Sequence, residues 1–376
     1  FFFKQKTAYE ITYGDWSSDV CSSDLNSAIF DVVVVGSANL DLVAHASRLP
    51  KPGETVSGSH FFEACGGKGV NQAIAAARAG AKTAFIGALG HDSAGDTLLS
   101  ALTKDGVDVN AVRRVSHQTG RALIGVSDDG ENSIIVVPGA NHAIDIDTIN
   151  KNESLIASAR VLLCQLEVSL KVVQRAFELA AKSTIKILNP APAQRLPSSL
   201  LGLVDIIAPN EHEADFLGGV EKLKSLGVKT IVVTQGENGA KLIDANGTLQ
   251  IDPYNVTPID TTGAGDAFCG MLAARLAAGQ NLGDSLRAAV VSGALATQTE
   301  GAVPSLPLWN MVEAKLESLI ARLENAVARQ EVLAGSPTLV AASAQTKTAE
   351  CKTAKEFIAL IAPKAAILKQ KARSEE

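Results

Sequence analysis

Short apolar runs alternate with longer amphipathic segments from residue 31 to about residue 308. The short runs predict buried strands, whereas apolar residues spaced three and four apart predict helices. Strands that alternate with helices in this way indicate an α/β domain whose mostly parallel sheet is buried on both faces. We expect strands at 31–36, 82–87, 161–165, 185–189, 205–210 and 230–235, and helices at 68–81, 93–106 and 170–182.

Two regions interrupt the alternation of strands and helices. The segment ETVSGSHFFEA (54–64) has a strand-like pattern, and RALIGVSDDGENSIIVVP (121–138) predicts two strands around a turn at Asp129–Gly130. These regions predict a small antiparallel sheet outside the main one. A hairpin is also expected at 240–253, with Asn246–Gly247 at its turn.

The two ends of the chain differ from its middle. Residues 1–25 resemble translated sequencing-adapter read-through, and the alternative is a disordered polar tail. Residues 311–335 predict an amphipathic helix, followed by a linker rich in Ala, Ser and Thr and by a second helix at 354–372. We therefore expect a leader without a role at 1–25, one α/β domain at 26–308 and a helical extension at 309–376.

Composition excludes several classes of protein. The 376 residues carry a net charge of −6, which favours neither a nucleic acid nor an anionic membrane as partner. No apolar run approaches the ~20 residues that span a bilayer. The five cysteines are scattered and form no CxxC motif, which predicts a reducing compartment such as the cytoplasm.

The stretch DTTGAGD (260–266) carries the clearest chemistry. It places small residues between two carboxylates, directly before an apolar segment that is typical of a helix. Glycines before a helix leave backbone N–H groups exposed, and the helix N-terminus adds partial positive charge, so the stretch predicts an anion site. Because Asp266 would repel a phosphate, its natural role is to accept a proton from a hydroxyl that attacks the phosphate. The structural alternative is a glycine-rich loop with a helix-capping aspartate.

Further polar or glycine-rich motifs follow most of the predicted strands. GSANLD (36–41), CQLE (164–167), APNEHEA (208–214) and TQGENG (234–239) lie at strand ends, and ACGGKGVNQA (64–73) opens a helix. In open parallel sheets, ligands bind beyond the carboxyl ends of the strands. One such loop is usually structural, but motifs at most strand ends predict a ligand crevice.

With these motifs, residues 31–308 resemble the ribokinase/PfkB family of sugar kinases along nearly their whole length. The Gly66–Gly67 turn and DTTGAGD are the broad family signatures, and narrower marks favour a kinase for ribose over one for fructose or adenosine. The narrower marks are GSANLD, LPKPGETV (49–56), GGKGVNQA (66–73), GANHAI (139–144), LNPAPA (188–193) and GAVPSLP (301–307). The resemblance implies a doubly wound α/β domain with a small β lid from about 37–66 and 120–138. It also implies a homodimer formed through the lid.

The resemblance further implies ATP-dependent phosphorylation of D-ribose at its 5-hydroxyl. Asp266 would be the base, and the backbone amides of Gly263, Ala264 and Gly265 would form the anion hole. Lys68 would lie near the phosphates. Together with Asp266, the implied substrate site consists of Asn39, Asp41, Gly67, Lys68, Asn71 and Glu167.

The resemblance implies two kinds of cofactor site. Asn210 and Glu213 would order Mg²⁺–ATP, largely through waters. Thr234, Gly236, Gly239 and Gly265 would line the rest of the nucleotide site. A monovalent cation, usually K⁺, would contact Asp260, the backbone of Thr262, Ala296, Thr299 and Gly301, and Ser305.

The chain departs from the family pattern in two places besides its ends. Residues 214–233 are fewer than relatives usually have there, as if a helix were deleted after Gly218 or Gly219. Val290 stands where relatives often have His or Asn near the adenine, which implies apolar contact alone. Two alternatives remain: a related kinase for deoxyribose, another sugar or a nucleoside, and a sugar-binding protein with impaired catalysis.

Overall fold

The computed structural model describes residues 30–319 and residue 321. The chain divides into two units, Phe1–Trp309 and Asn310–Glu376. The described part of the second unit, residues 310–319 and 321, is helical, as predicted for the start of the extension. The leader at 1–25 and the helix predicted at 354–372 lie outside the described residues. No helix in the described ranges has the length and apolar character needed to cross a membrane.

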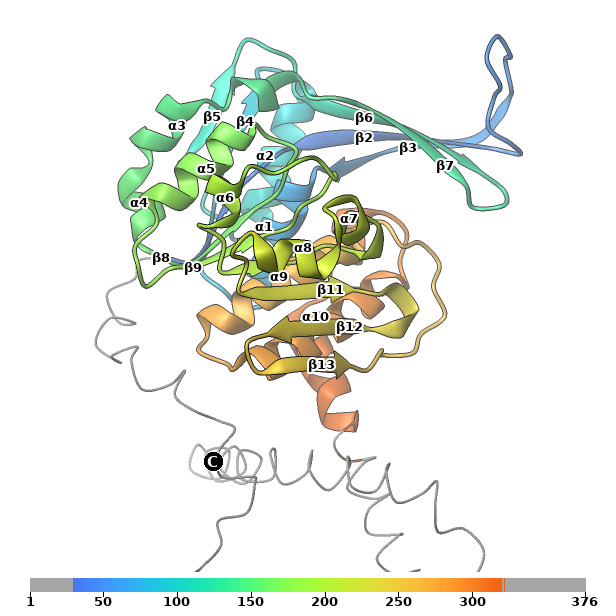
Figure 1. Ribbon diagram of the computed structural model, residues 1–376. Helices are drawn as coiled ribbons and strands as arrows, with labels where there is room; N and C mark the ends of the chain where they lie inside the picture. Colours follow the sequence, from blue (N-terminus) through green and yellow to red (C-terminus); the bar gives the residue numbers. More distant parts are fainter. Residues whose placement is uncertain (1–29, 320, 322–376) are drawn as a thin grey trace, which may run out of the picture. The chain divides into compact units, whose positions relative to one another are not determined.

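The main sheet of the first unit has the strand order β13-β12-β11-β10-β9-β8-β1-β4-β5 (Figure 1). Pairing is parallel from β11 to β5 and antiparallel for β11–β12 and β12–β13. The sheet grows outward from β1 in both directions, which confirms the doubly wound, mostly parallel fold. Its strands are β1 (Phe30–Val35), β4 (Thr83–Gly90), β5 (Val112–Val115), β8 (Ala159–Cys164), β9 (Ile185–Leu188), β10 (Ile206–Ile207), β11 (Thr230–Thr234), β12 (Ala240–Asp244) and β13 (Gly247–Ile251).

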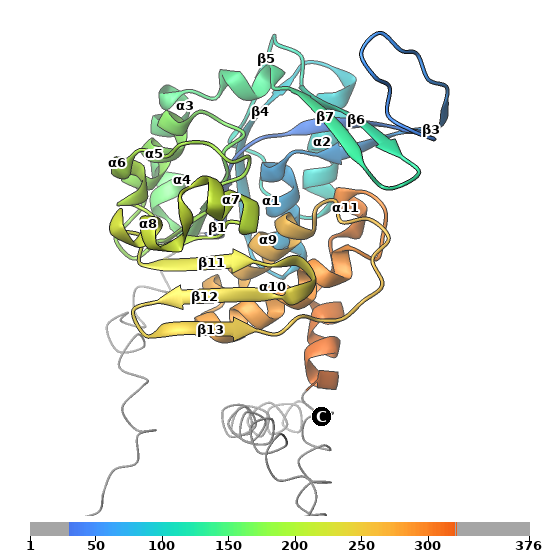
Figure 2. The same cartoon turned by 45° about the vertical axis from the view of Figure 1, so that its right-hand side comes forward.

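Helices bury both faces of this sheet, which explains the run of four valines in β1. Val32, Val33, Val34 and Val35 are all fully buried. Val33 and Val35 belong to a core cluster with side chains of α3 to α8, whereas α9 packs against both α1 and α10 (Figures 1 and 2). The helices are α1 (Lys68–Arg78), α2 (Ser93–Lys104), α3 (Ile146–Lys151), α4 (Glu153–Ala157), α5 (Leu170–Leu179), α6 (Ser198–Leu201), α7 (Glu211–Phe216), α8 (Gly219–Ser225), α9 (Ala264–Ala277), α10 (Leu282–Ala296) and α11 (Ala302–Ser305).

A second, four-stranded sheet projects away from the main one (Figure 1). It contains β2 (Asn39–Ala46), β3 (Gly58–Gly66), β6 (Gly120–Ser127) and β7 (Asn132–Val137) in the order β3-β2-β6-β7. All four strands fall within 37–66 and 120–138, the ranges that the family resemblance implies for a lid, and β2 lies before the strand-like segment at 54–64. The outer pairs β2–β3 and β6–β7 are antiparallel as predicted, whereas the central pair β2–β6 is parallel. Parallel pairing is possible there because no tight turn joins these two strands.

The predicted hairpin at 240–253 is present as β12 and β13. Its turn lies one residue earlier than expected. Asp244 pairs with Gly247, so Ala245 and Asn246 occupy the turn, and Gly247, with φ +123°, opens the second strand. Glycine is still needed directly after the turn, because other residues rarely adopt that φ.

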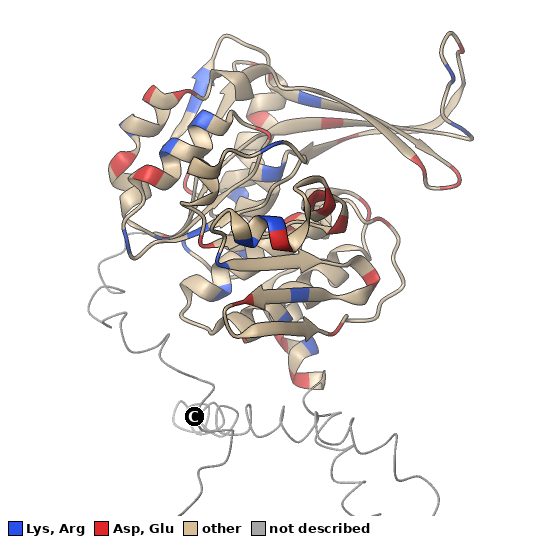
Figure 3. Ribbon diagram, viewed as in Figure 1, with Lys and Arg blue, Asp and Glu red and all other residues tan. Residues whose placement is uncertain are grey.

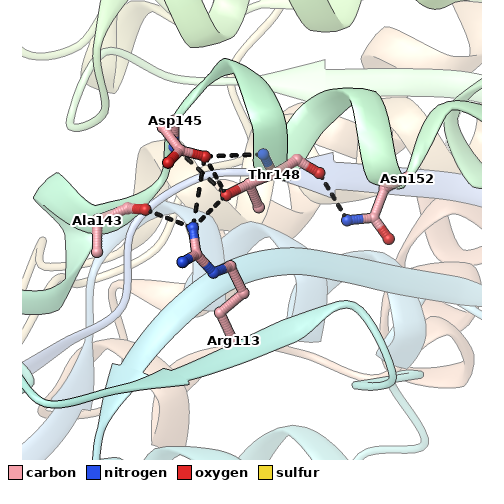
Figure 4. Close-up of polar contacts among 5 residues, drawn as sticks. All are labelled: Arg113, Ala143, Asp145, Thr148 and Asn152. Carbon is pink, nitrogen blue, oxygen red and sulfur yellow. Dashed lines mark hydrogen bonds and ion pairs between the residues drawn. The ribbon is translucent and has the colours of Figure 1, made fainter.

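Arg113 on β5 fixes the connection that returns from the small sheet to the main one (Figure 4). Its Nη1 donates to the carbonyl of Ala143 at 2.8 Å and to Oγ1 of Thr148 at 2.5 Å. Asp145 caps α3 by accepting from the backbone N–H of Thr148 at 2.8 Å. These hydrogen bonds of Arg113 therefore hold the end of the short helix η1 (Gly139–Ala143), which contacts β6 of the small sheet.

Candidate active site

The predicted motifs meet at the carboxyl ends of the parallel strands, as expected for an open α/β sheet. Residues 36–38 follow β1, residues 165–167 follow β8, Asn189 follows β9, and Asn210 follows β10. Helices α1 and α9 begin at the same edge and pack closely. A Cβ on Gly270 would lie 2.5 Å from the Cβ of Ala75, so only glycine permits this approach. The first turns of the two helices therefore lie side by side.

Both helices begin at a glycine with positive φ. Gly67 precedes α1 with φ +86°, and Gly263 precedes α9 with φ +79°. A Cβ on Gly67 would also lie 2.7 Å from the backbone nitrogen of Asn39. Glycine at Gly67 satisfies both the backbone conformation and the close approach to β2, and glycine at Gly263 satisfies the backbone conformation.

Asp266 lies in the first turn of α9 and is only 7% exposed. Its Oδ2 accepts a hydrogen bond from Nδ2 of Asn71 at 2.9 Å, and its Oδ1 accepts one from Nε2 of Gln72 at 2.8 Å. Both donors come from the first five residues of α1. The structure thus joins the predicted base to the predicted sugar-binding residue Asn71. Gln72 was not among the predicted site residues, although it stands beside Asn71 in GGKGVNQA.

The predicted anion hole lies at the N-terminus of α9. The N–H of Ala264 donates to the carbonyl of Thr261 at 3.2 Å. The N–H groups of Gly265 and Asp266 belong to the first turn, where a helix supplies no acceptor of its own. A Cβ built on Gly265 would meet no atom within 4 Å, so there is open space beside these amides.

Lys68 and two further carboxylates complete the charge pattern around Asp266. Oε2 of Glu167 accepts from the backbone N–H of Lys68 at 3.1 Å and from Oγ of Ser37. Burial lowers the pKa of Lys68, but the carboxylates of Asp266 and Glu167 outweigh this effect and hold that pKa above its usual value. Burial, followed by the charges of Glu167 and Asp266, raises the pKa of Asp41 to about 7.

Asn39, the first residue of β2, is hydrogen-bonded to Asn141, which was not among the predicted site residues. Nδ2 of Asn141 donates to Oδ1 of Asn39 at 2.8 Å and to the carbonyl of Ala38 at 3.1 Å, while its Oδ1 accepts from the N–H of Ala38 at 2.9 Å. Both asparagines are almost fully buried. Asn141 lies in the motif GANHAI, which could have indicated its importance because the motif is one of the marks of the family resemblance.

The predicted nucleotide residues lie around the ends of β10 and β11. Asn210 and Glu213 form a capping box, in which the N–H of Glu213 donates to Asn210 Oδ1 at 2.7 Å and the N–H of Asn210 donates to Glu213 Oε2 at 2.9 Å. The N–H of Thr234 donates to the carbonyl of Pro209 at 2.9 Å. Gly236 and Gly239, with φ +54° and +82°, form the turn after β11.

The short segment 214–233 and Val290 are the two departures from the family pattern. Residues 214–233 contain the end of α7, all of α8 and most of β11, so the short connection still delivers β11 to its place beside β10. Gly218 and Gly219 join α7 to α8 with φ +92° and +83°. Val290 is buried in α10, being 8% exposed.

Asp260 draws together the segments predicted for a monovalent cation. Its Oδ1 accepts from the N–H of Thr262 at 2.9 Å, and its Oδ2 accepts from the N–H of Gly301 at 2.8 Å. Burial alone would raise the pKa of Asp260, but these hydrogen bonds hold it below the usual value. Ala296 ends α10, Thr299 lies in the bend that follows, and Ser305 Oγ donates to the carbonyl of Ala302 at 2.7 Å.

The donor set of this crevice fits a magnesium ion that arrives with a nucleotide. In the part of the chain that the structure describes, no three His, Cys, Asp or Glu side chains converge on a common metal position. Mg²⁺ is commonly held by one or two carboxylates together with substrate phosphates and waters. Glu213 at the start of α7 supplies a carboxylate of this kind.

Comparison with known proteins agrees with this geometry. The model of the pfkB family carbohydrate kinases matches residues 30–309. A ribokinase from Haemophilus influenzae is 39% identical over 290 residues, covering 73% of this chain and 95% of its own length. A deoxyribokinase from Salmonella typhi is 32% identical over 292 residues, covering 74% and 95%. Arabidopsis thaliana ribokinase, solved in complex with ribose and ATP, superposes with a TM-score of 0.71 at 33% identity, covering 76% of this chain and 98% of that one. The chain therefore belongs to the pfkB family of carbohydrate kinases.

Proposed function

We propose that this protein transfers the γ-phosphoryl group of ATP to the 5-hydroxyl of D-ribose. The observation that carries the proposal is the position of Asp266, whose carboxylate is held by Asn71 and Gln72 at the N-terminus of α9. Among the relatives described above, the ribokinases favour ribose as the acceptor. The intact pair of Asn39 and Asp41 at the start of β2 supports a free pentose as the acceptor.

In this mechanism the chain positions the reactants and stabilises charge. Asn39, Asp41 and Glu167 form hydrogen bonds with the sugar hydroxyls, and these bonds bring the primary alcohol of the sugar to Asp266. Asp266 takes the proton as the alcohol attacks the phosphorus. The amides of the α9 N-terminus and the ammonium of Lys68 stabilise the transferring group. Asn210 and Glu213 would order Mg²⁺ with ATP through waters, and the ion would supply neutralisation of phosphate charge there.

A K⁺ ion behind the anion hole is part of the proposal. Asp260 supplies the carboxylate, and the backbone carbonyls of Thr262, Ala296, Thr299 and Gly301 and the hydroxyl of Ser305 supply neutral oxygens. The hydrogen bonds that the N–H groups of Thr262 and Gly301 donate to Asp260 support it, since they gather these segments around one charge. An ion there would hold the loop that precedes α9 in the orientation its amides need.

We also propose a homodimer that pairs the small sheets, in a cytoplasmic protein. Leu123, Ile134, Ile135, Val136 and Val137 of β6 and β7 are 45–64% exposed, an unusual concentration of apolar surface. Figure 3 shows few charges along these strands and acidic residues at the hairpin tip. Sedimentation of Ile135→Glu tests the dimer, with Ile146→Glu on α3 as the matched control. A wild-type monomer would contradict it.

The proposed cytoplasmic location rests on the cysteines of the described residues. Cys65, Cys164 and Cys269 are free, which supports a reducing compartment.

The deciding experiment is ADP release with Mg²⁺–ATP and D-ribose, 2-deoxyribose, fructose or adenosine. Each reaction is run with K⁺ and with a large organic cation in its place, for the wild type and for Asp266→Asn. We expect turnover with ribose that needs K⁺ and falls by about 10²–10⁴-fold in the variant. Turnover on another acceptor alone would keep the mechanism and change the substrate. A folded protein that binds ribose without any turnover would be a sugar-binding protein with impaired catalysis.

A further inference from the structure

Behind Asp266 lies a cluster of three buried side-chain amides, Gln72, Gln165 and Asn189. Gln72 and Gln165 are fully buried, and Asn189 is 8% exposed. They come from α1, from the segment after β8 and from the segment after β9, so the tertiary fold alone brings them together. The first contact is that between Gln72 Nε2 and Asp266 Oδ1, at 2.8 Å. We call these three residues the amide network.

The hydrogen bonds of the network run in one direction, which a backbone carbonyl sets. The carbonyl of Ala208 can only accept, so it requires the Nδ2 group of Asn189, which lies 3.0 Å away. Oδ1 of Asn189 must then face Gln72, whose Nε2 donates to it at 3.1 Å. On the other side, Nε2 of Gln165 donates to Oε1 of Gln72 at 2.6 Å.

Gln72 therefore has one favourable amide orientation. Its carbonyl faces Gln165, and its NH₂ group divides its two hydrogens between Asn189 and Asp266. The flipped amide would place oxygen against both the Asp266 carboxylate and the Asn189 carbonyl. In a buried site such unpaired acceptors cost far more than in water, so the flip is strongly disfavoured. With Asn71 on Oδ2, both oxygens of Asp266 are then held.

We propose that the amide network positions the Asp266 carboxylate for catalysis and that Gln165 and Asn189 act through Gln72. The inference rests on the proposed role of Asp266 as the base. The network lies on the protein side of the carboxylate, so it orients the base rather than contacting the sugar. Losing it should lower kcat, which depends on the placement of the base, much more than it raises the KM for ribose.

The test is a double-mutant cycle with Gln72→Met and Gln165→Met, which keep volume and remove the amides. For Gln72→Met we expect kcat to fall about 10- to 100-fold, the range set by losing one hydrogen bond to a charged group. For Gln165→Met we expect a loss of about 3- to 10-fold, because Oε1 of Gln72 then loses its donor and the Gln72 side chain is held less firmly against Asp266. The KM for ribose should stay within about twofold. The double variant should be no slower than Gln72→Met, because Gln165 has no separate route to the base.

Two controls separate this inference from a stability effect and from failure of the proposed function. Thr184→Val removes a buried hydrogen bond to the carbonyl of Ala159, 2.7 Å long, at the opposite end of β9, and should leave kcat unchanged. Asp266→Asn must be inactive; if it turns over normally, the proposed base and the inference both fail. If Asp266→Asn is inactive but the losses in kcat from Gln72→Met and Gln165→Met multiply in the double variant, Gln165 does not act through Gln72. The proposal for the amide network is then overturned, and the proposed role of Asp266 as the base is kept. Should Gln72→Met not fold, Gln165→Met alone decides: a kcat equal to the wild type overturns the proposal, and a loss with unchanged KM supports it.

Discussion

One arginine joins three segments next to the proposed cation site. Arg78, the last residue of α1, donates through Nε and Nη2 to both carboxylate oxygens of Asp105, at 2.7 and 3.0 Å. Its Nη1 donates to the carbonyls of Val303 and Leu306, each at 2.8 Å. The side chains of Arg78 and Asp105 are 18% and 17% exposed. The guanidinium therefore ties the end of α2 and the segment of Ser305 to α1.

The magnitude of its loss follows from this burial. Arg78→Met keeps most of the aliphatic volume but leaves the Asp105 carboxylate and two carbonyls without their donor. Removing one partner of a buried pair costs about 3–5 kcal/mol, and an exposed pair contributes about 0–1 kcal/mol. Because both side chains are mostly buried, we expect a loss of about 3 kcal/mol in the free energy of unfolding. For a domain of this size that lowers Tm by about 6–12 °C.

Thermal and urea unfolding of matched variants measures this effect. Arg175→Met is the control, because Arg175 pairs with Glu178 at 3.4 Å while both side chains are more than a third exposed. It should cost less than about 1 kcal/mol. Arg78→Lys keeps the charge but not the two-pronged geometry, and should fall between the wild type and Arg78→Met. Equal losses for Arg78→Met and Arg175→Met would refute the reasoning from burial.

Three further predictions concern the site itself. The pKa of Asp41 is raised to about 7 in the folded protein, whereas the unfolded chain releases this proton near the ordinary value of 3.8. The free energy of unfolding of the sugar-free wild type should therefore fall relative to that of Asp41→Asn as pH rises from 4 to 7. Denaturant titrations measure this difference, and free energies of the two proteins that change in parallel with pH would contradict it. Gly263→Ala should lower kcat at least about 10-fold, since φ is +79° and the new Cβ would lie 3.0 Å from the Cα of Ala302; ribose binding by calorimetry should be retained, and normal turnover would exclude a role for this turn. Asn141→Leu removes three hydrogen bonds that hold Ala38 and Asn39, so calorimetry should show ribose affinity falling about 10-fold, and unchanged affinity would mean that Asn39 is positioned without it.

Much of the fold could be predicted from local patterns. The buried strands and the long helices α1, α2 and α5 follow from apolar runs and periodicity, because both are set by residues close in the chain. The short elements β5, α3 and α4 were not predicted, since a few residues of mixed character carry little periodic signal. The parallel pairing of β2 with β6 was also out of reach, because it joins segments about 80 residues apart.

The site divides in the same way. By itself the sequence determined the glycine-led helix starts, the placement of Asp266 in the first turn of α9 and the polar residues at the strand ends, because turns and helix N-termini are local chemistry. Only the tertiary structure decided which of these residues touch. It set the first turn of α1 against that of α9 and so gave Asp266 its two amide donors. It also aligned Gln165 and Asn189 behind Gln72, and Asn141 behind Asn39. Such contacts depend on where parallel strands end in space, which close packing of the whole core fixes and no local pattern records.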